Sequence, residues 1–312
     1  MVLFMANRLQ HKIACSRYAF PLTIVYACGI WLSGGLLRHQ LWASFILMLV
    51  TTVVMAELNN QHALFRTYSR MLSCSYLALS VAALPLFVHP EACVVQLCFA
   101  LTYLFMFRAY QDKSAVSNVF NAFFFIGLAS VWFVQTLFLV PLWWIILRFY
   151  VMGMGWRTFW ASLLAVITPY WFVGGYYVYM HDVDSLVHHF SSITNFAPLF
   201  DFQSISLLNL LTLCFISALG IIGMLHFLLN RSKDKIRIRL FFSSFMLMMA
   251  ATIVFIILQP THLPNLLPAL IVSVSPLIGH YITFTGSRLS GITCLALFAF
   301  TLAITGYQLW TH

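Results

Sequence analysis

Long apolar runs constrain what this chain can fold into more than any other feature of its sequence. A helix needs roughly 20 apolar residues to cross a bilayer core about 30 Å thick. Runs of about that length, separated by short polar segments, lie at 20–37, 41–56, 71–88, 92–107, 160–180, 205–229, 240–258, 269–285 and 290–309. The pattern predicts an all-α fold, a polytopic bundle of transmembrane helices.

The composition supports the same fold class. Hydrophobic residues make up 62% of the chain and charged residues only 7%, whereas a soluble domain has about 45–50% and about 25%. So few charges cannot cover a water-exposed surface. We therefore expect residues 1–312 to form a single integral membrane domain with no soluble domain.

The segment 119–150 is also apolar, but it is too long for one span and short for two ordinary ones. Gln135, Thr136 and Pro141 interrupt it near its middle. Polar side chains and proline are typical of a break between helices. The segment is therefore predicted to be a hairpin of two short helices, which gives about eleven spans, within a range of nine to eleven.

The basic residues test this count, because cytoplasmic loops carry an excess of Lys and Arg. With the hairpin counted as two spans, all of the 16 basic residues except Arg38 fall on the side of the N-terminus. A single span at 119–150 would place the basic cluster 231–239 on the opposite side. The N-terminus is therefore predicted to lie inside, and the net charge of +9 is interpreted mainly as an orientation signal. Nucleic-acid binding is not expected, because the charge is spread over several loops.

The densest group of polar residues follows the second run, at 57–70. If this segment is helical, Asn59, His62, Arg66 and Arg70 share one face, because their spacings are three, four and four. Two guanidinium groups on that face match the geometry of a phosphate. The alternative is a solvated linker whose arginines contact ordinary anionic lipid headgroups.

Two further features add candidates. The inner loop 108–114 contains Arg108 and Asp112, and Asp112 could pair with Arg66 or Arg70. His280 lies inside a predicted span, after a proline and a glycine that could kink the helix beside a cavity; the alternative is a packed histidine that bonds to a neighbouring helix. The candidate ligand-binding residues are Glu57, Asn60, His62, Arg66, Arg70, Arg108, Asp112 and His280.

Signatures of common enzymes and metal sites are absent from the sequence. The seven Cys residues show no C-x-x-C spacing, and the outer pairs His181, Asp182 and His188, His189 match no zinc signature. Phosphate-binding loops, dinucleotide fingerprints and nucleophile elbows are also missing. We therefore expect no catalytic residue, no metal and no cofactor, and a protein that is not an enzyme.

Three segments carry a resemblance to a known family. The stretch 58–71, the loop 108–113 and the Phe-rich hairpin 119–150 together resemble an uncharacterised family of polytopic inner-membrane proteins from Bacteroidota. The resemblance covers about the first half of the chain. It implies a location in the bacterial inner membrane and implies no activity.

The function expected from these features is binding of a lipid-linked phosphate or a small ligand at the cytoplasmic interface. Its partners would be membrane lipids, either anionic lipids or polyprenyl phosphates. A first alternative is a non-catalytic structural or assembly subunit of an envelope complex, which would have a protein partner. A second is an envelope glycan enzyme similar to O-antigen polymerases or ligases. Such an enzyme needs outer arginines for its pyrophosphate-linked substrate, and only Arg38 is predicted to lie outside.

Overall fold

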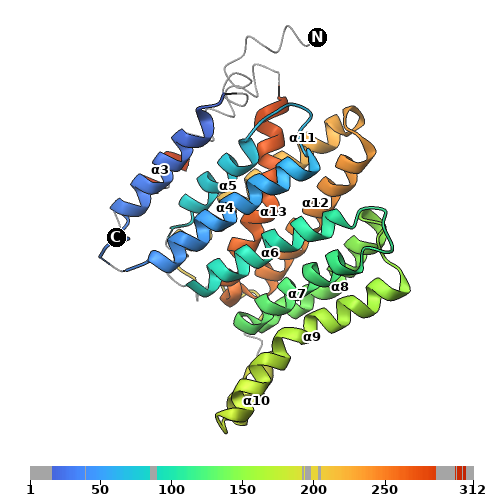
Figure 1. Cartoon of the computed structure of the whole chain (residues 1–312). Coiled ribbons are helices and arrows are strands. Elements are labelled where there is room, and N and C mark those ends of the chain that lie inside the picture. Colours follow the sequence, from blue (N-terminus) through green and yellow to red (C-terminus); the bar gives the residue numbers. More distant parts are fainter. Residues whose placement is uncertain are drawn as a thin grey trace.

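The predicted all-helical architecture is confirmed. A computed structural model describes residues 16–38, 40–84, 90–191, 193, 198–202, 205–285, 299, 301–303 and 305–306, and every regular element among them is a helix (Figure 1). Most of the apolar run 290–309 lies outside the described residues. The chain is a bundle in which helices far apart in sequence lie side by side.

The bundle has eleven described α-helices. Their bounds are α3 Ala19–Ser33, α4 Trp42–His62, α5 Met71–Val81, α6 Pro90–Arg108, α7 Val116–Trp132, α8 Val140–Ile145, α9 Trp156–Tyr179, α10 Val183–Ser191, α11 Leu207–Asn230, α12 Ile236–Leu258 and α13 Leu263–Phe284. Within the described residues, 6 helical segments are long and apolar enough to cross a membrane: Trp42–His62, Pro90–Arg108, Trp156–Tyr179, Leu207–Lys233, Ile236–Leu258 and Pro260–Phe284. Shorter apolar helical segments are Ala19–Ser33, Met71–Val81, Val116–Trp132 and Val134–Tyr150.

Helix α13 forms the centre of the bundle and is buried along nearly its whole length. It packs against α5, α6, α11 and α12. A helix that is apolar on every side can be covered only when neighbours surround it. The close approach of α5 depends on Gly279, since a Cβ there would lie 3.2 Å from the Cα of Leu72. Gly279 therefore serves packing, and α13 continues through it and through Pro276 without interruption.

The segment 119–150 folds back on itself, as its polar interruption predicts. Helix α7 ends at Trp132, Phe133 is extended, and the chain returns through the 3₁₀ segment Val134–Leu139, α8 and the π-helical turn Ile146–Tyr150. The Gln111 N–H before α7 donates to the Val151 carbonyl after the return leg, at 2.8 Å. Because this bond joins the two ends of the segment, its two legs form a hairpin.

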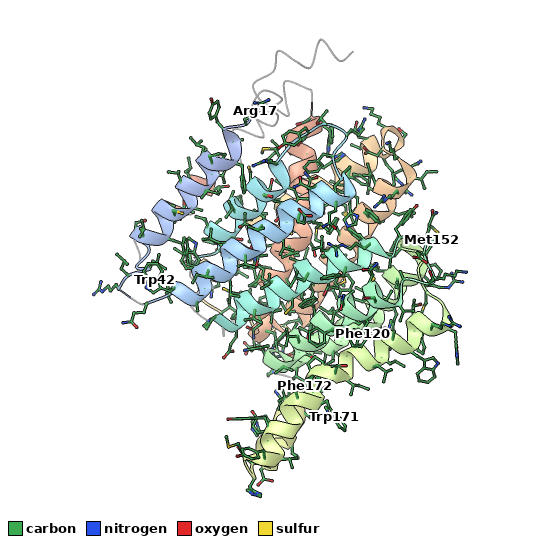
Figure 2. The ribbon with its side chains drawn as sticks, viewed as in Figure 1. Arg17, Trp42, Phe120, Met152, Trp171 and Phe172 are labelled. Atoms are coloured by element: carbon green, nitrogen blue, oxygen red, sulfur yellow. The ribbon has the colours of Figure 1, made fainter. Side chains whose placement is uncertain are left out.

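Contacts between polar connections place most of the basic residues at one end of the bundle. Arg66, after α4, pairs with Asp234 between α11 and α12, and Arg108 at the end of α6 donates to Gln61 in α4. We call this the basic end. Arg17, just before α3 (Figure 2), lies at the same end, because the nearby Phe20 ring lies 5.5 Å from the Arg70 guanidinium.

Candidate functional site

The connection 63–70 is not helical, so the prediction that Asn59, His62, Arg66 and Arg70 share a helix face is wrong. Helix α4 ends at His62, and Ala63 adopts a left-handed conformation with φ 46° and ψ 54°. The physical reason is burial of the apolar residues that follow: the Leu64 side chain has 0% exposure. The chain turns into the bundle to bury them, which separates the two arginines from the helix.

Phe65 continues this inward turn. Its ring packs against Phe284 and His280, with centroid distances of 6.1 and 6.4 Å. The Asn59 side-chain amide donates to the Ser69 carbonyl at 2.9 Å and ties the end of the connection back to α4. The connection is therefore fixed at both ends and in its middle.

Three charged or titratable side chains from distant segments meet at the basic end. The Arg66 Nε lies 2.7 Å from Asp234 Oδ1, and His280 Nε2 lies 3.4 Å from Asp234 Oδ2. The side chains of Asp234 and His280 are 1% and 0% exposed, whereas that of Arg66 is 32% exposed. The carboxylate is thus buried between a guanidinium that reaches the surface and an imidazole that does not.

Asp234 remains ionised in this setting. Burial by itself raises the pKa of the carboxyl group, but the close approach and charge of His280 and the charge of Arg66 outweigh it, so the pKa of Asp234 is lowered from 3.8. A buried carboxylate needs such partners, because an unpaired buried charge is costly. The sequence analysis missed Asp234; the available signal was one acidic residue within the basic cluster 231–239.

His280 is enclosed almost entirely by aromatic rings. Phe227, Phe242 and Phe284 contact its imidazole, with centroid distances of 5.2, 5.1 and 4.7 Å. His226 of α11 lies beside it at 5.5 Å. Within the part of the chain that the structure describes, neither ring nitrogen of His280 makes a hydrogen bond, although Nε2 approaches Asp234 Oδ2 to 3.4 Å. His280 therefore has one nitrogen directed at Asp234 and one that faces the aromatic enclosure.

His62 occupies a second enclosed position. Its ring packs edge-on against Phe107 and Phe241, at 5.7 and 5.6 Å. The Nη2 of Arg237 lies 3.0 Å from His62 Nδ1, and because a guanidinium can only donate, Nδ1 is the acceptor. The Arg237 guanidinium also covers the Tyr110 ring at 5.5 Å. His62 thus fastens α4 to α12 and has no open surface toward a ligand.

The remaining candidates of the two loops form local bonds. Gln61 donates to Glu57 and accepts from Arg108 Nε at 2.7 Å, while Asn60 is exposed. Asp112 accepts the Ser114 N–H at 2.8 Å, and these Ser114 bonds lower the pKa of Asp112.

The expected pairing of Asp112 with Arg66 or Arg70 is not formed. Asp112 stabilises the turn of its own loop through Ser114, whereas the partner of Arg66 is Asp234. A short side chain in a turn satisfies its oxygens most easily on the residues directly after it.

Arg70 differs from Arg66 in having no acidic partner among the described residues. Its Nε donates to the Tyr68 hydroxyl at 3.1 Å, and its guanidinium lies 5.5 Å from the centre of the Phe20 ring. The residue is exposed. Arg70 directly precedes Met71, the first residue of α5.

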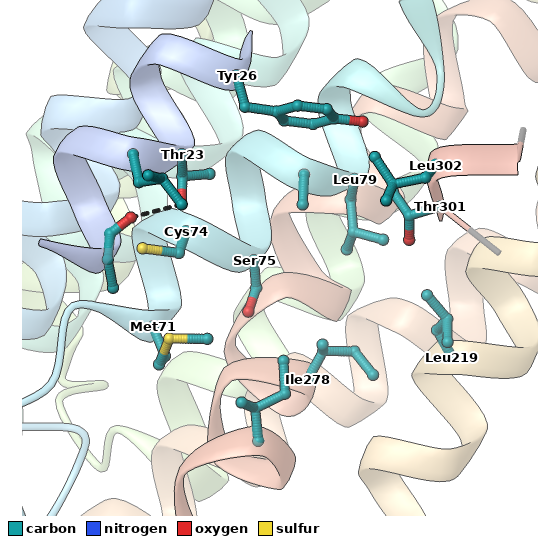
Figure 3. Close-up of a pocket in the computed structure, with 14 residues that line it drawn as sticks. Thr23, Tyr26, Met71, Cys74, Ser75, Leu79, Leu219, Ile278, Thr301 and Leu302 are labelled. Carbon is teal, nitrogen blue, oxygen red and sulfur yellow. Dashed lines mark hydrogen bonds between the residues drawn. The ribbon is translucent and has the colours of Figure 1, made fainter. Parts of the chain in front are cut away.

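Met71 is one of the residues that line an apolar cavity of about 280 Å³ (Figure 3). The cavity lies between α3, α5, α11, α13 and the described residues 301–302. Its lining is Ala19, Leu22, Thr23, Tyr26, Met71, Cys74, Ser75, Ala78, Leu79, Leu219, Ile278, Ile282, Thr301 and Leu302. The α3 and α5 members recur at three- and four-residue spacing, so each helix presents one stripe to the cavity.

Both stripes start at the basic end. Ala19 and Met71 are the first residues of α3 and α5, and Arg17 and Arg70 come just before them. From Ala19 to Tyr26 the stripe is roughly 10 Å long at the helical rise of about 1.5 Å per residue. The cavity therefore combines a long apolar wall with positive charge at one end.

The chain matches no family model, no curated protein and no solved structure in the comparisons. Within the described residues no group of three or more His, Cys, Asp or Glu side chains is placed to hold a metal ion. The candidate function therefore rests on the geometry of the cavity and of the basic end.

Proposed function

We propose that this protein is a multi-pass protein of the bacterial inner membrane with about eleven spans and its N-terminus inside. The long and short apolar helices, together with the run 290–309, supply that number of apolar segments. The hairpin of α7 and α8 supports counting 119–150 twice. The contacts between connections place several Arg residues at the basic end. Because Lys and Arg are enriched in cytoplasmic loops, this supports a cytoplasmic location for the basic end.

We further propose that the protein binds a phosphate-bearing lipid without catalysing a reaction. The observation that carries this proposal is the apolar cavity whose lining starts at Ala19 and Met71, just after Arg17 and Arg70 in the sequence. Arg70 would contact the phosphate, and the cavity would hold the adjoining part of the lipid chain. A volume near 280 Å³ is close to the lower limit of about 300 Å³ for ligand pockets, so it suits part of one chain.

The apolar cavity and Arg70 should contribute differently to the affinity for a phosphate-bearing lipid. A lipid chain leaves an environment as apolar as the cavity, so burial of the chain gives little net free energy and mainly selects for shape. An arginine near an anionic surface contributes about 1 kcal/mol, and a charge-assisted bidentate bond is stronger than an ordinary hydrogen bond. Affinity should therefore depend mainly on the phosphate and selectivity on the chain.

The test compares three probes on the full-length protein in neutral-lipid nanodiscs, with native mass spectrometry as the readout. A polyprenyl phosphate should bind, whereas the polyprenol of the same length and inorganic phosphate should bind weakly. The polyprenol lacks the headgroup and inorganic phosphate lacks the chain, so the three arms separate the two contributions. Equal binding of the phosphate and the alcohol would contradict the proposal.

A matched pair of variants locates the headgroup. Arg70→Ala should reduce binding of the polyprenyl phosphate by about tenfold or more, in line with the loss of a charge-assisted contact. Arg108→Ala removes the same charge from α6, which does not line the cavity, and should leave binding within about twofold. An equal loss in both variants would indicate unspecific attraction to the basic end.

A second candidate function is the assembly subunit with a protein partner. The observation that favours it is the end of α9, which extends beyond the bundle with α10 (Figure 1) and exposes Trp171 and Phe172 by 77% and 70% (Figure 2). Large exposed aromatic residues are enriched in protein interfaces. Trp171→Ser with Phe172→Ser should release a co-purifying subunit and leave lipid binding unchanged.

A further inference from the structure

Arg66 and Arg70 belong to one short connection but are in opposite electrostatic states. Asp234 neutralises Arg66 at 2.7 Å, whereas Arg70 has no carboxylate within 4.0 Å in the described part of the chain. The Arg66 side chain is nevertheless 32% exposed, so it reaches the surface from which a lipid headgroup would approach. The ion pair with the buried Asp234 carboxylate keeps the Arg66 guanidinium from binding another anion.

We propose that Arg66 is a second phosphate-binding group. While His280 is neutral, the ion pair with Asp234 keeps Arg66 from the phosphate. Protonated His280 replaces Arg66 as the partner of Asp234, and Arg66 can then bind the phosphate. Binding of a phosphate-bearing lipid is then coupled to uptake of a proton at His280. This inference rests on the proposed lipid-binding function and adds its regulation.

The charges around His280 allow its imidazolium to replace the Arg66 guanidinium as the cation that pairs with Asp234. The charged or titratable groups that face it are Asp234 from the α11–α12 connection, Arg66 from the connection 63–70 and His226 from α11. Lys233 acts on His226 rather than on His280. Helix α12 contributes Phe242, and Leu72 of α5 packs at the neighbouring Gly279; neither can titrate. Asp234 is the only anion in this group, so two cations compete for one carboxylate when His280 is charged.

The two states differ in which cation satisfies the carboxylate. With His280 neutral, Arg66 provides the compensating charge, and removing it would leave a buried carboxylate unpaired, which is strongly unfavourable. With His280 protonated, the imidazolium takes over, because its Nε2 already lies 3.4 Å from Asp234 Oδ2. Arg66 can then turn toward a phosphate at Arg70 while the buried site stays electrically neutral.

Thermodynamic linkage requires the effect to be reciprocal. If a proton at His280 strengthens lipid binding, the bound lipid must strengthen proton binding at His280 by the same factor. Couplings of this kind are typically about 5- to 150-fold. A change on the order of tenfold is therefore the scale to look for.

The experiment measures the affinity of the full-length protein for polyprenyl phosphate at pH 8 and pH 5.5. The phosphate titrates in this range as well, so His280→Gln serves as the reference that carries only the ligand's own titration. Wild type should gain on the order of tenfold more affinity than His280→Gln on lowering the pH. Asp234→Asn should bind tightly at both pH values, because its Arg66 is free, and Arg66→Ala should bind weakly at both.

The experiment has a control variant, and the outcomes that contradict the coupling differ from the outcome that contradicts lipid binding. Glu91→Gln removes an exposed carboxylate from the first turn of α6, away from the basic end, and should reproduce the wild-type profile. Identical pH profiles of wild type and His280→Gln, or an Asp234→Asn variant that folds yet binds no more tightly than wild type at pH 8, would overturn the coupling while leaving the lipid site intact. If Asp234→Asn does not fold, the comparison with His280→Gln decides alone. Absence of binding by wild type at both pH values would overturn the proposed function itself.

Discussion

The Arg66 guanidinium and the Asp234 carboxylate form an ion pair 2.7 Å long that joins the connection after α4 to the connection after α11. The acid is 1% exposed and the base 32%. The pair therefore belongs partly to the interior of the bundle and partly to its surface. Because only Asp234 is fully buried, loss of Arg66 should destabilise the fold, while Arg66 itself can be reached from the surface.

Removal of Arg66 should cost more stability than removal of both partners. Arg66→Ala leaves Asp234 buried without its main cation, which we expect to cost about 2–4 kcal/mol, reduced from the usual cost by the exposure of Arg66. The double variant Arg66→Met, Asp234→Leu should be the more stable of the two, because it leaves no buried charge. Thermal unfolding in detergent measures both, and a double variant less stable than Arg66→Ala would contradict this account.

The lowered pKa of Asp234 predicts an acid-sensitive contribution to stability. A carboxyl group whose pKa is lower in the folded state stabilises the fold fully above its unfolded pKa, here 3.8, and loses that contribution as the pH falls through the folded pKa. The difference in melting temperature between wild type and Asp234→Asn should therefore shrink as the pH falls below 3.8 through the folded pKa of Asp234. A difference that keeps growing as the pH falls below 3.8 would show that another group dominates.

Two glycines provide a matched test of packing against α13. A Cβ at Gly279 would lie 2.9 Å from Phe65 Cζ and 3.2 Å from Leu72 Cα, whereas nothing lies within 4 Å of one at Gly29. Gly279→Ala should lower stability by about 1–3 kcal/mol through overpacking. Gly29→Ala should be neutral or stabilising, because alanine favours a helix by about 1 kcal/mol over glycine. Equal effects at the two positions would contradict the close approach of α5 and α13.

The hairpin of α7 and α8 predicts opposite accessibility for its turn and its ends. In a cysteine-free background, Phe138→Cys near the turn should react with an impermeant thiol reagent from the outer side. Met152→Cys, next to the bond between Gln111 and Val151, should react from the inner side only. Labelling of both cysteines from the same side would rule out two spans in 119–150.

Filling the cavity should abolish lipid binding without unfolding the protein. Ala78 lines the middle of the α5 stripe, and Ala78→Phe places a ring in space that the lipid chain would occupy. Binding of polyprenyl phosphate should fall at least tenfold while the melting temperature changes by only a few degrees. Gly175→Ala, on the part of α9 with no atom within 4 Å of the new Cβ, is the matched control and should bind as wild type does.

Much of the fold could be predicted from local sequence patterns. In a membrane the backbone must satisfy its own hydrogen bonds, so an apolar run of sufficient length forms a helix wherever it occurs. The interruption at Gln135 and Thr136 likewise predicted a break, which the structure places at Phe133. The prediction failed at 63–70, where helical spacing was assumed but the burial of Leu64 and Phe65 ended the helix.

The site was predictable only in part. Arg70 and the position of His280 follow from the sequence, because unusual charged or titratable residues beside apolar runs stand out. The cavity does not, since it depends on how stripes from α3 and α5 align with α11 and α13.

The sequence by itself determined that this chain forms apolar helices and which connections carry its positive charge. Hydrophobicity and backbone hydrogen bonding act within a single helix, so they can be evaluated residue by residue. Only the tertiary structure decided that Arg66 pairs with Asp234, and that the stripe of α5 that follows Arg70 lines a cavity. A buried charge must find its partner in space, and helices far apart in sequence bring that partner into place.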